Sequence, residues 1–271
     1  MKKAVPFLVL AMLLPAALGC GGGSGGEASQ GDALALLMES SKAMSTLSGY
    51  RMNGRMEVGM GKEDASGGGS LSMEISSEID NTGESPSQRI TVKMGSIASE
   101  AYIVGDYYYQ EVPGQGWIKM NVAQYRAQNL SMGMMDPRQW DYLAEAAEGI
   151  VVEEKTEEAS VVSLELGEEF FRQSFESYQE SLSGEEREQM REWISLMEES
   201  AGGFTANIRL WIGEKDRLMR RMEMSYRMQN AQVGLLTGVA ELEISDYNAD
   251  IRIALPEEAK GASEFSPSSM N

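Results

Sequence analysis

Alternation of apolar and polar residues with a period of two is the feature of this sequence that most limits its fold. Over residues 50–60, apolar side chains such as Met52 and Met56 alternate with polar ones such as Arg51 and Glu57. Similar segments recur at a spacing of roughly ten residues, separated by Gly, Pro and Asp turn signals. The expected strands are 50–60, 71–79, 90–94, 98–104, 107–112, 117–120, 149–155, 160–166, 208–212, 218–228, 240–244 and 250–253. Short strands joined by turns predict an antiparallel meander with one buried face.

Helical periodicity appears at two places in the chain. Residues 32–47 carry apolar side chains at helical spacing, with Asp32 as a plausible N-cap. A largely helical insert is expected at about 136–200, where Asp136-Pro137 pairs an N-cap with a proline at the first helical position. This insert separates two strand-rich halves, and the chain has no linker long enough to divide them. We therefore expect an α+β fold with one domain over residues 32–262, followed by a polar tail at 263–271.

The N-terminus has the pattern of an export signal. Met1-Lys2-Lys3 is basic, residues 4–18 are apolar, and this run is shorter than the roughly 20 residues that a membrane-spanning helix needs. The end of the run, Leu18-Gly19-Cys20, resembles the lipobox of bacterial lipoproteins, although Ala17 replaces the usual Leu. The resemblance implies a signal peptide over 1–19, a lipid-modified Cys20 and a Gly/Ser-rich tether over 20–31. The alternative is an ordinary secretory signal with a chance cysteine.

Composition excludes several chemistries. The chain has no histidine and one cysteine, so Ser/His/Asp triads, His-ligated metals and intrachain disulfides are ruled out. The formal net charge of −19 disfavours nucleic acid and anionic lipid headgroups as partners, because both are themselves negative. The acidic pairs Glu153-Glu154 and Glu157-Glu158 flank an expected hairpin turn, where charges are usually solvated. We expect no cofactor, no metal and no catalysis.

Methionine is unusually frequent, with 20 copies. Several lie at the apolar positions of the expected strands, where unbranched and polarizable side chains accept varied apolar partners such as lipid tails. The alternative is an ordinary dry core in which Met stands where Leu or Ile would serve. The Tyr107-Tyr108-Tyr109 run is interpreted as a strand that contributes rings to both faces of the sheet.

Three segments resemble the LolA/LolB-like and LppX/LprG-like lipoproteins. They are the helix 32–47 running into Tyr50-Arg51-Met52-Asn53-Gly54, residues 210–224, and residues 253–259. The chain departs from the family pattern in the acidic helical pair 168–200 and at residues 214–217, which replace the usual Asp-x-x-Thr-Gly turn. The resemblance implies a curved antiparallel β half-barrel, with helices packed over its concave face and an apolar cavity for acyl chains between them.

The leading hypothesis is a lipoprotein anchored to the cell membrane through Cys20, on its extracytoplasmic face, that binds a lipid or similar amphiphile without catalysis. The candidate cavity-lining residues are Met52, Met56, Met73, Ile75, Ile90, Val92, Met94, Ile208, Leu210, Met222, Met224 and Met228. The alternative is an envelope sensor or adaptor with a filled core that docks a protein partner. A hydrolase ranks third.

Overall fold

The computed structural model describes six stretches of the chain. They are residues 30–61, 69–112, 115–122, 149–170, 203–230 and 234–265, together with positions 125, 147, 172, 173, 176, 184 and 188. The expected signal peptide, Cys20 and most of the tether lie outside the described residues. So do the helix expected after Asp136 and most of the acidic helical pair 168–200.

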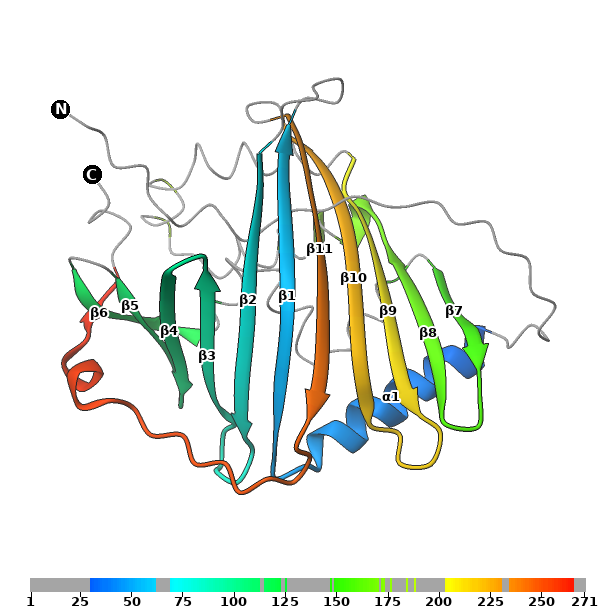
Figure 1. Cartoon of the computed structure of the whole chain (residues 1–271), viewed down its shortest axis with the longest axis horizontal. Coiled ribbons are helices and arrows are strands. Elements are labelled where there is room, and N and C mark those ends of the chain that lie inside the picture. The colour runs from blue at the N-terminus through cyan, green and yellow to red at the C-terminus, as the bar shows by residue number, and fades with distance from the viewer. Residues whose placement is uncertain are drawn as a thin grey trace.

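One large sheet dominates the described part of the chain (Figure 1). Its strands are β1 (Gly49–Gly61), β2 (Gly69–Asp80), β3 (Ser87–Met94), β4 (Ile97–Val104), β5 (Tyr107–Val112), β6 (Gly116–Asn121), β7 (Gly149–Lys155), β8 (Ala159–Leu166), β9 (Thr205–Gly213), β10 (Met219–Asn230), β11 (Gly234–Ser245) and β12 (Ser263–Glu264). Their order in space is β12-β6-β5-β4-β3-β2-β1-β11-β10-β9-β8-β7. All neighbours are antiparallel except β12 and β6. Pairing of β1 with β11 thus joins the two strand-rich halves into one sheet.

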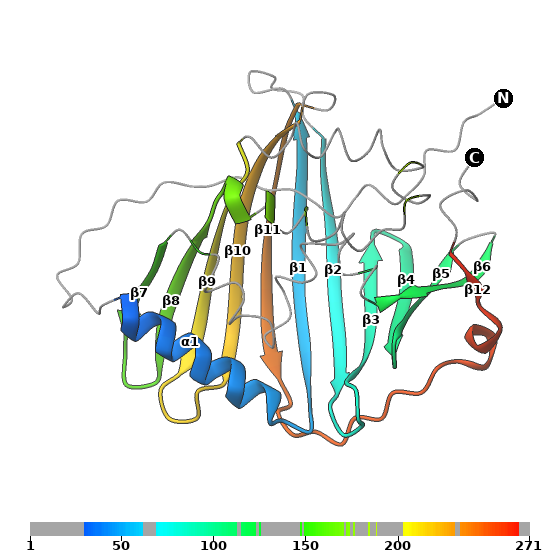
Figure 2. The same ribbon diagram turned by 180° about the vertical axis from the view of Figure 1, so that it is seen from behind.

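The helix α1 (Gln30–Ser45) lies across one face of this sheet, over β7–β10 (Figure 2). Its buried residues Ala33, Leu37 and Met44 belong to the same apolar cluster as the strands beneath it. The sheet is open and curved around this side, which we call the concave face. The expected antiparallel half-barrel is confirmed, with a helix over its concave face.

Cross-strand register places the apolar positions of neighbouring strands side by side on the concave face. One row runs across eight strands from β7 to β3: Val152, Val162, Leu210, Met222, Leu242, Gly54, Ile75 and Val92. Because side chains alternate between the two faces of a strand, polar residues of the same strands lie on the convex face. The alternation read from the sequence therefore sorts the two faces correctly.

Charged side chains on the convex face form ion pairs between neighbouring strands. Arg51 on β1 contacts Glu78 on β2 at 2.9 Å and Asp246, just after β11, at 2.8 Å. Other pairs on this face join Arg89 to Glu100, Arg209 to Glu223, and Arg221 to Glu241. Each exposed pair stabilises the fold by less than about 1 kcal/mol, yet together they favour this register over a shifted one.

A second, smaller cluster lies under the β3–β6 side of the sheet. It contains Ile90, Ala101, Ile103, Tyr108, Met120 and Tyr125, and Val92 packs against both clusters. The rings of Tyr108 and Tyr125 stack with centroids 3.6 Å apart, whereas Tyr107 and Tyr109 contact each other on the opposite face. The interpretation of the tyrosine run as a two-faced strand is confirmed.

The strand expected at 250–253 is wrong. Both edges of β1 are already paired, one with β2 and the other with β11, so residues 250–253 have no free strand edge to pair with there. Left-handed residues Asp246 (φ 53°) and Asn248 (φ 60°) turn the chain away from the sheet after β11. The Ile251 N–H then bonds the carbonyl of Ala249 rather than another strand.

The expected tail at 263–271 also needs correction at its start. After the 3₁₀ helix η3 (Glu257–Gly261), residues 263–264 form β12, which pairs parallel with β6. The Phe265 N–H donates to the carbonyl of Lys119 at 2.7 Å, and Phe265 packs against the second cluster. Residues 263–265 therefore pair and pack with the sheet, and residues 266–271 lie outside the described ranges.

Gly54 marks a very close approach between β1 and β11. A Cβ at this position would lie 2.0 Å from the backbone oxygen of Glu241 and 2.4 Å from Cδ2 of Leu242. Glycine is thus required where the two halves of the sheet meet, because any side chain would push the central strands apart.

We predict that Gly54→Ala lowers the free energy of unfolding by about 1–3 kcal/mol, since overpacking forces backbone shifts. Gly149→Ala is the matched control, because its Cβ would meet only ordinary contacts from 3.6 Å outward. Urea unfolding of both variants measures the difference. Equal stability of the two would contradict the close approach.

Candidate functional site

The concave face is the candidate site, and it brings most of the expected lining residues together. Nine of them lie in the main cluster and are at most 9% exposed: Met52, Met56, Met73, Ile75, Ile208, Leu210, Met222, Met224 and Met228. Ile90 instead belongs to the second cluster. Val92 is half-buried between the two clusters, and Met94 is half-buried at the end of β3. Their role in ligand binding stays a prediction.

Several further residues share this face. They include Val162, Leu164, Tyr226, Leu236, Ala240 and Leu242 from the strands and Leu37 and Met44 from α1. The signal for the strand residues was present in the sequence, because the parity that selects Met222 and Met224 also selects Tyr226. The position of α1 over β7–β10 has no comparable local signal.

The concave face carries no charge at the paired positions of β1, β2 and β8–β11. Among the described side chains there, the polar ones are Tyr50, Ser77, Ser160 and Tyr226. Burying an ion among such residues is costly because nothing compensates its lost hydration. The face therefore suits apolar chains and uncharged polar groups.

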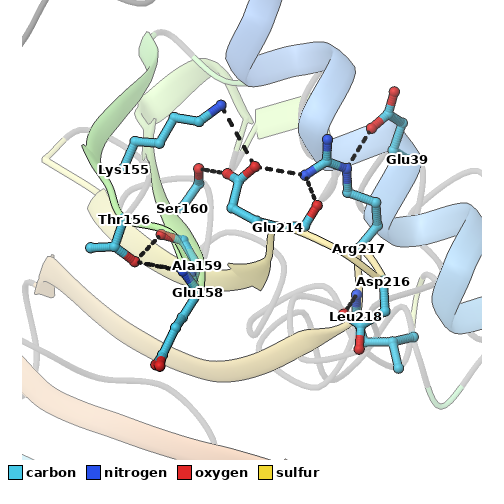
Figure 3. A network of polar contacts seen from close by, with 10 residues as sticks. All are labelled: Glu39, Lys155, Thr156, Glu158, Ala159, Ser160, Glu214, Asp216, Arg217 and Leu218. Atoms are coloured by element: carbon cyan, nitrogen blue, oxygen red, sulfur yellow. Dashed lines mark hydrogen bonds and ion pairs between the residues drawn. The ribbon is translucent and has the colours of Figure 1, made fainter.

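A polar network fastens α1 to the β9–β10 turn (Figure 3). Arg217 in the turn donates from Nε to Glu39 of α1 at 2.9 Å. Its guanidinium also bonds the carbonyl oxygen of Glu214 at 2.7 Å and the Glu214 carboxylate at 3.1 Å. Ser160 on β8 and Lys155 on β7 contact the same carboxylate. Residues from three elements, α1, β7 and β8, thus meet the turn at the edge of the concave face.

Arg217 takes a left-handed conformation in this turn. It lies directly before Leu218, where the turn of the LolA/LppX-like proteins that the sequence resembles has Gly, and its φ is 59°. A non-glycine residue there costs roughly 1–2 kcal/mol. The contacts of the Arg217 guanidinium with Glu39 and Glu214 offset part of this cost. Glycine would avoid the cost but could form neither contact.

Hydrogen bonding holds the pKa of Glu214 below its usual range. The largest cause is the hydroxyl of Ser160, which is itself buried, followed by the guanidinium of Arg217 and the charge of Lys155. All three favour the carboxylate over the carboxylic acid, so Glu214 is ionised at neutral pH.

Neither a metal site nor a membrane-crossing helix is found in the part of the chain that the structure describes. No three His, Cys, Asp or Glu side chains of these residues are grouped so that they could hold an ion. The helices among them are too short or too polar to cross a bilayer.

Solved structures similar to this chain include three bacterial proteins. LprF from Mycobacterium bovis is 13% identical, with 85% of this chain and 99% of that chain covered and a TM-score of 0.45. Lipoprotein LppX from Mycobacterium tuberculosis is 11% identical, with 83% and 100% covered and a TM-score of 0.46. A LolA superfamily protein from Nitrosomonas europaea is 11% identical, with 83% and 95% covered and a TM-score of 0.29. No protein-family model and no curated protein sequence matches the chain. Two of the three structures carry the names LppX and LolA, to which the sequence resemblance points.

We predict that Ser160→Ala makes the protein more sensitive to acid. A depressed pKa in the folded state contributes stability that is complete above the unfolded-state pKa of Glu214 and is lost as pH falls through the folded-state pKa. Removing the main cause should raise the midpoint pH of acid unfolding and cost about 1 kcal/mol at pH 7. Ser163→Ala on the same strand is the control. Circular dichroism across pH 2–7 measures both, and identical midpoints would contradict the assignment.

Proposed function

We propose that this protein is a lipoprotein of the bacterial envelope that holds an acyl-chain lipid against its concave face and does no chemistry on it. The observation that carries the proposal is the continuous uncharged face formed by β1, β2 and β8–β11. Acyl chains need such a surface, because each methylene kept from water is worth about 0.8 kcal/mol.

Methionines support an apolar ligand in particular. Five methionines lie in the main cluster within four adjacent strands, β2, β1, β11 and β10: Met52, Met56, Met73, Met222 and Met224. Their unbranched side chains change rotamer more readily than Ile or Val, so the same face fits chains of differing shape.

The anchor is part of the proposal. Signal cleavage would remove Lys2 and Lys3 and none of the 42 acidic residues, so charge would not hold the mature chain to anionic headgroups. A lipid-modified Cys20 supplies an apolar attachment instead, and two or more acyl chains hold stably where one is marginal. Only a short Gly-rich stretch separates Cys20 from α1, which starts at Gln30, so the helix would stay near the membrane surface.

We predict that Cys20→Ala abolishes membrane retention, either by releasing the protein or by leaving its signal uncleaved in a precursor of higher mass. Fractionation of cells followed by immunoblotting and intact-mass measurement checks this. Ser24→Ala, four residues along the tether, is the control and should behave as wild type. A mature, correctly cleaved Cys20→Ala protein that still sediments with membranes would overturn the anchor.

We predict that Met224→Trp removes co-purifying lipid from the full-length protein while the fold survives. Ser225→Trp adds the same bulk to the convex face of the same strand and should leave lipid content unchanged. Mass spectrometry of lipid extracts and thermal unfolding measure the two effects.

Met224→Ala separates a lipid site from a filled core. In a filled core this truncation costs about 2–5 kcal/mol. On a ligand-accepting face the loss should be smaller, and lipid content should change. A loss within the filled-core range, together with unchanged lipid content in Met224→Trp, would favour the adaptor hypothesis.

A further inference from the structure

The hydroxyl of Tyr226 is buried without a hydrogen-bond partner. Tyr226 lies on β10 and is 3% exposed, and its oxygen has no hydrogen-bond partner among the residues that the structure describes. Burial raises the pKa of this phenol far above its usual value, so the group is a neutral O–H at every physiological pH. A buried donor left unpaired destabilises a fold, and phenylalanine would avoid that cost.

The surroundings of Tyr226 explain its ring and leave its hydroxyl unexplained. Directly opposite it are Ala206 on β9 and Gly238 on β11, the two smallest residue types. An aromatic ring beside such residues fills the space that they leave, and the ring of Phe204 lies 6.2 Å away. Phenylalanine would fill that space equally well.

A trapped water is a poor partner for this hydroxyl. A buried water needs two to four polar groups to be held. The concave-face residues nearest Tyr226 along and across the strands offer apolar side chains or none: Met224, Met228, Ala206, Gly238, Leu166 and Val58. The described concave-face residues around Tyr226 thus leave its hydroxyl available to a polar group of a bound ligand.

We infer that the Tyr226 hydroxyl donates a hydrogen bond to an ester carbonyl of the lipid held on the concave face. This inference rests on the proposed function and adds the position of one polar group of the ligand. A carboxylate or phosphate is disfavoured at this depth, because the surrounding strand positions supply no cation to compensate its charge. An ester carbonyl is an uncharged acceptor that commonly sits between acyl chains.

The test pairs a one-atom change in the protein with a matched change in the ligand. The full-length protein in mild detergent is offered an equimolar mixture of hexadecyl hexadecanoate and dihexadecyl ether, which share both chains and differ in one carbonyl. Native mass spectrometry reads the ratio of the two complexes. We expect wild type to favour the ester about threefold to tenfold, which is the net contribution of one hydrogen bond, and Tyr226→Phe to bind the two equally.

Two controls keep the result specific. Tyr108→Phe removes a buried hydroxyl in the second cluster that is already bonded to Tyr125, and should leave the ester preference unchanged. Ligand-free Tyr226→Phe should melt at or above the temperature of wild type, because it loses an unpaired group, whereas Tyr108→Phe should melt lower.

The outcomes separate this inference from the function beneath it. If wild type binds both probes with no ester preference, or if Tyr226→Phe keeps the preference, the hydrogen bond is refuted and the carrier proposal stands. If wild type binds neither probe, the carrier proposal fails and the inference fails with it. A lower melting temperature of Tyr226→Phe would also refute the inference, because the hydroxyl would then have a partner within the protein.

Discussion

Register between β1 and β11 is the constraint on which the rest of this structure depends. These strands come from opposite ends of the chain and form the centre of the sheet. A shift of one residue would turn the methionines of β1 toward water and its arginines toward the interior, since side chains alternate with a period of two. Gly54 permits the close approach between these strands, and the contacts of Arg51 with Glu78 on β2 and Asp246 just after β11 penalise a shifted pairing. The concave face exists only because this pairing is unique.

The alternation of apolar and polar residues was sufficient to predict most strands and which of their side chains face the core. It could not predict features that depend on contacts between residues far apart in the sequence. Met222 and Met224 were identified because alternation is visible within one strand. The segment 250–253 looked like a strand by the same rule, but whether a strand forms there depends on a free edge, and β1 has none. Ile90 had the right parity yet belongs to the second cluster, because its neighbour across the strands is Ala101 of β4, which lies in that cluster. Arg217 could not be paired with Glu39 from the sequence, since the two lie 178 residues apart.

Separation of charge between the two faces ties the strong acidity of the chain to its proposed ligand. A lipid with about 30 methylenes would cost roughly 25 kcal/mol to expose to water, so its carrier needs a large surface without ionic groups. The chain meets this need while carrying 42 acidic residues, because the strands direct their charges to the convex side and pair many of them there. Acidity then keeps the convex face hydrated without affecting the interior.

At the polar contact between α1 and the β9–β10 turn, the stabilising and destabilising free energies nearly cancel. The Arg217–Glu39 pair is largely exposed, so it contributes at most about 1 kcal/mol, and the left-handed conformation of Arg217 costs about as much. The hold of α1 on the sheet therefore comes from Ala33, Leu37 and Met44, which are fully buried against the strands. The ion pair makes the position of α1 along the strands specific, because apolar packing alone would allow the helix to slide. Apolar packing therefore holds α1 over the concave face, and the Arg217–Glu39 pair fixes where along the strands it lies.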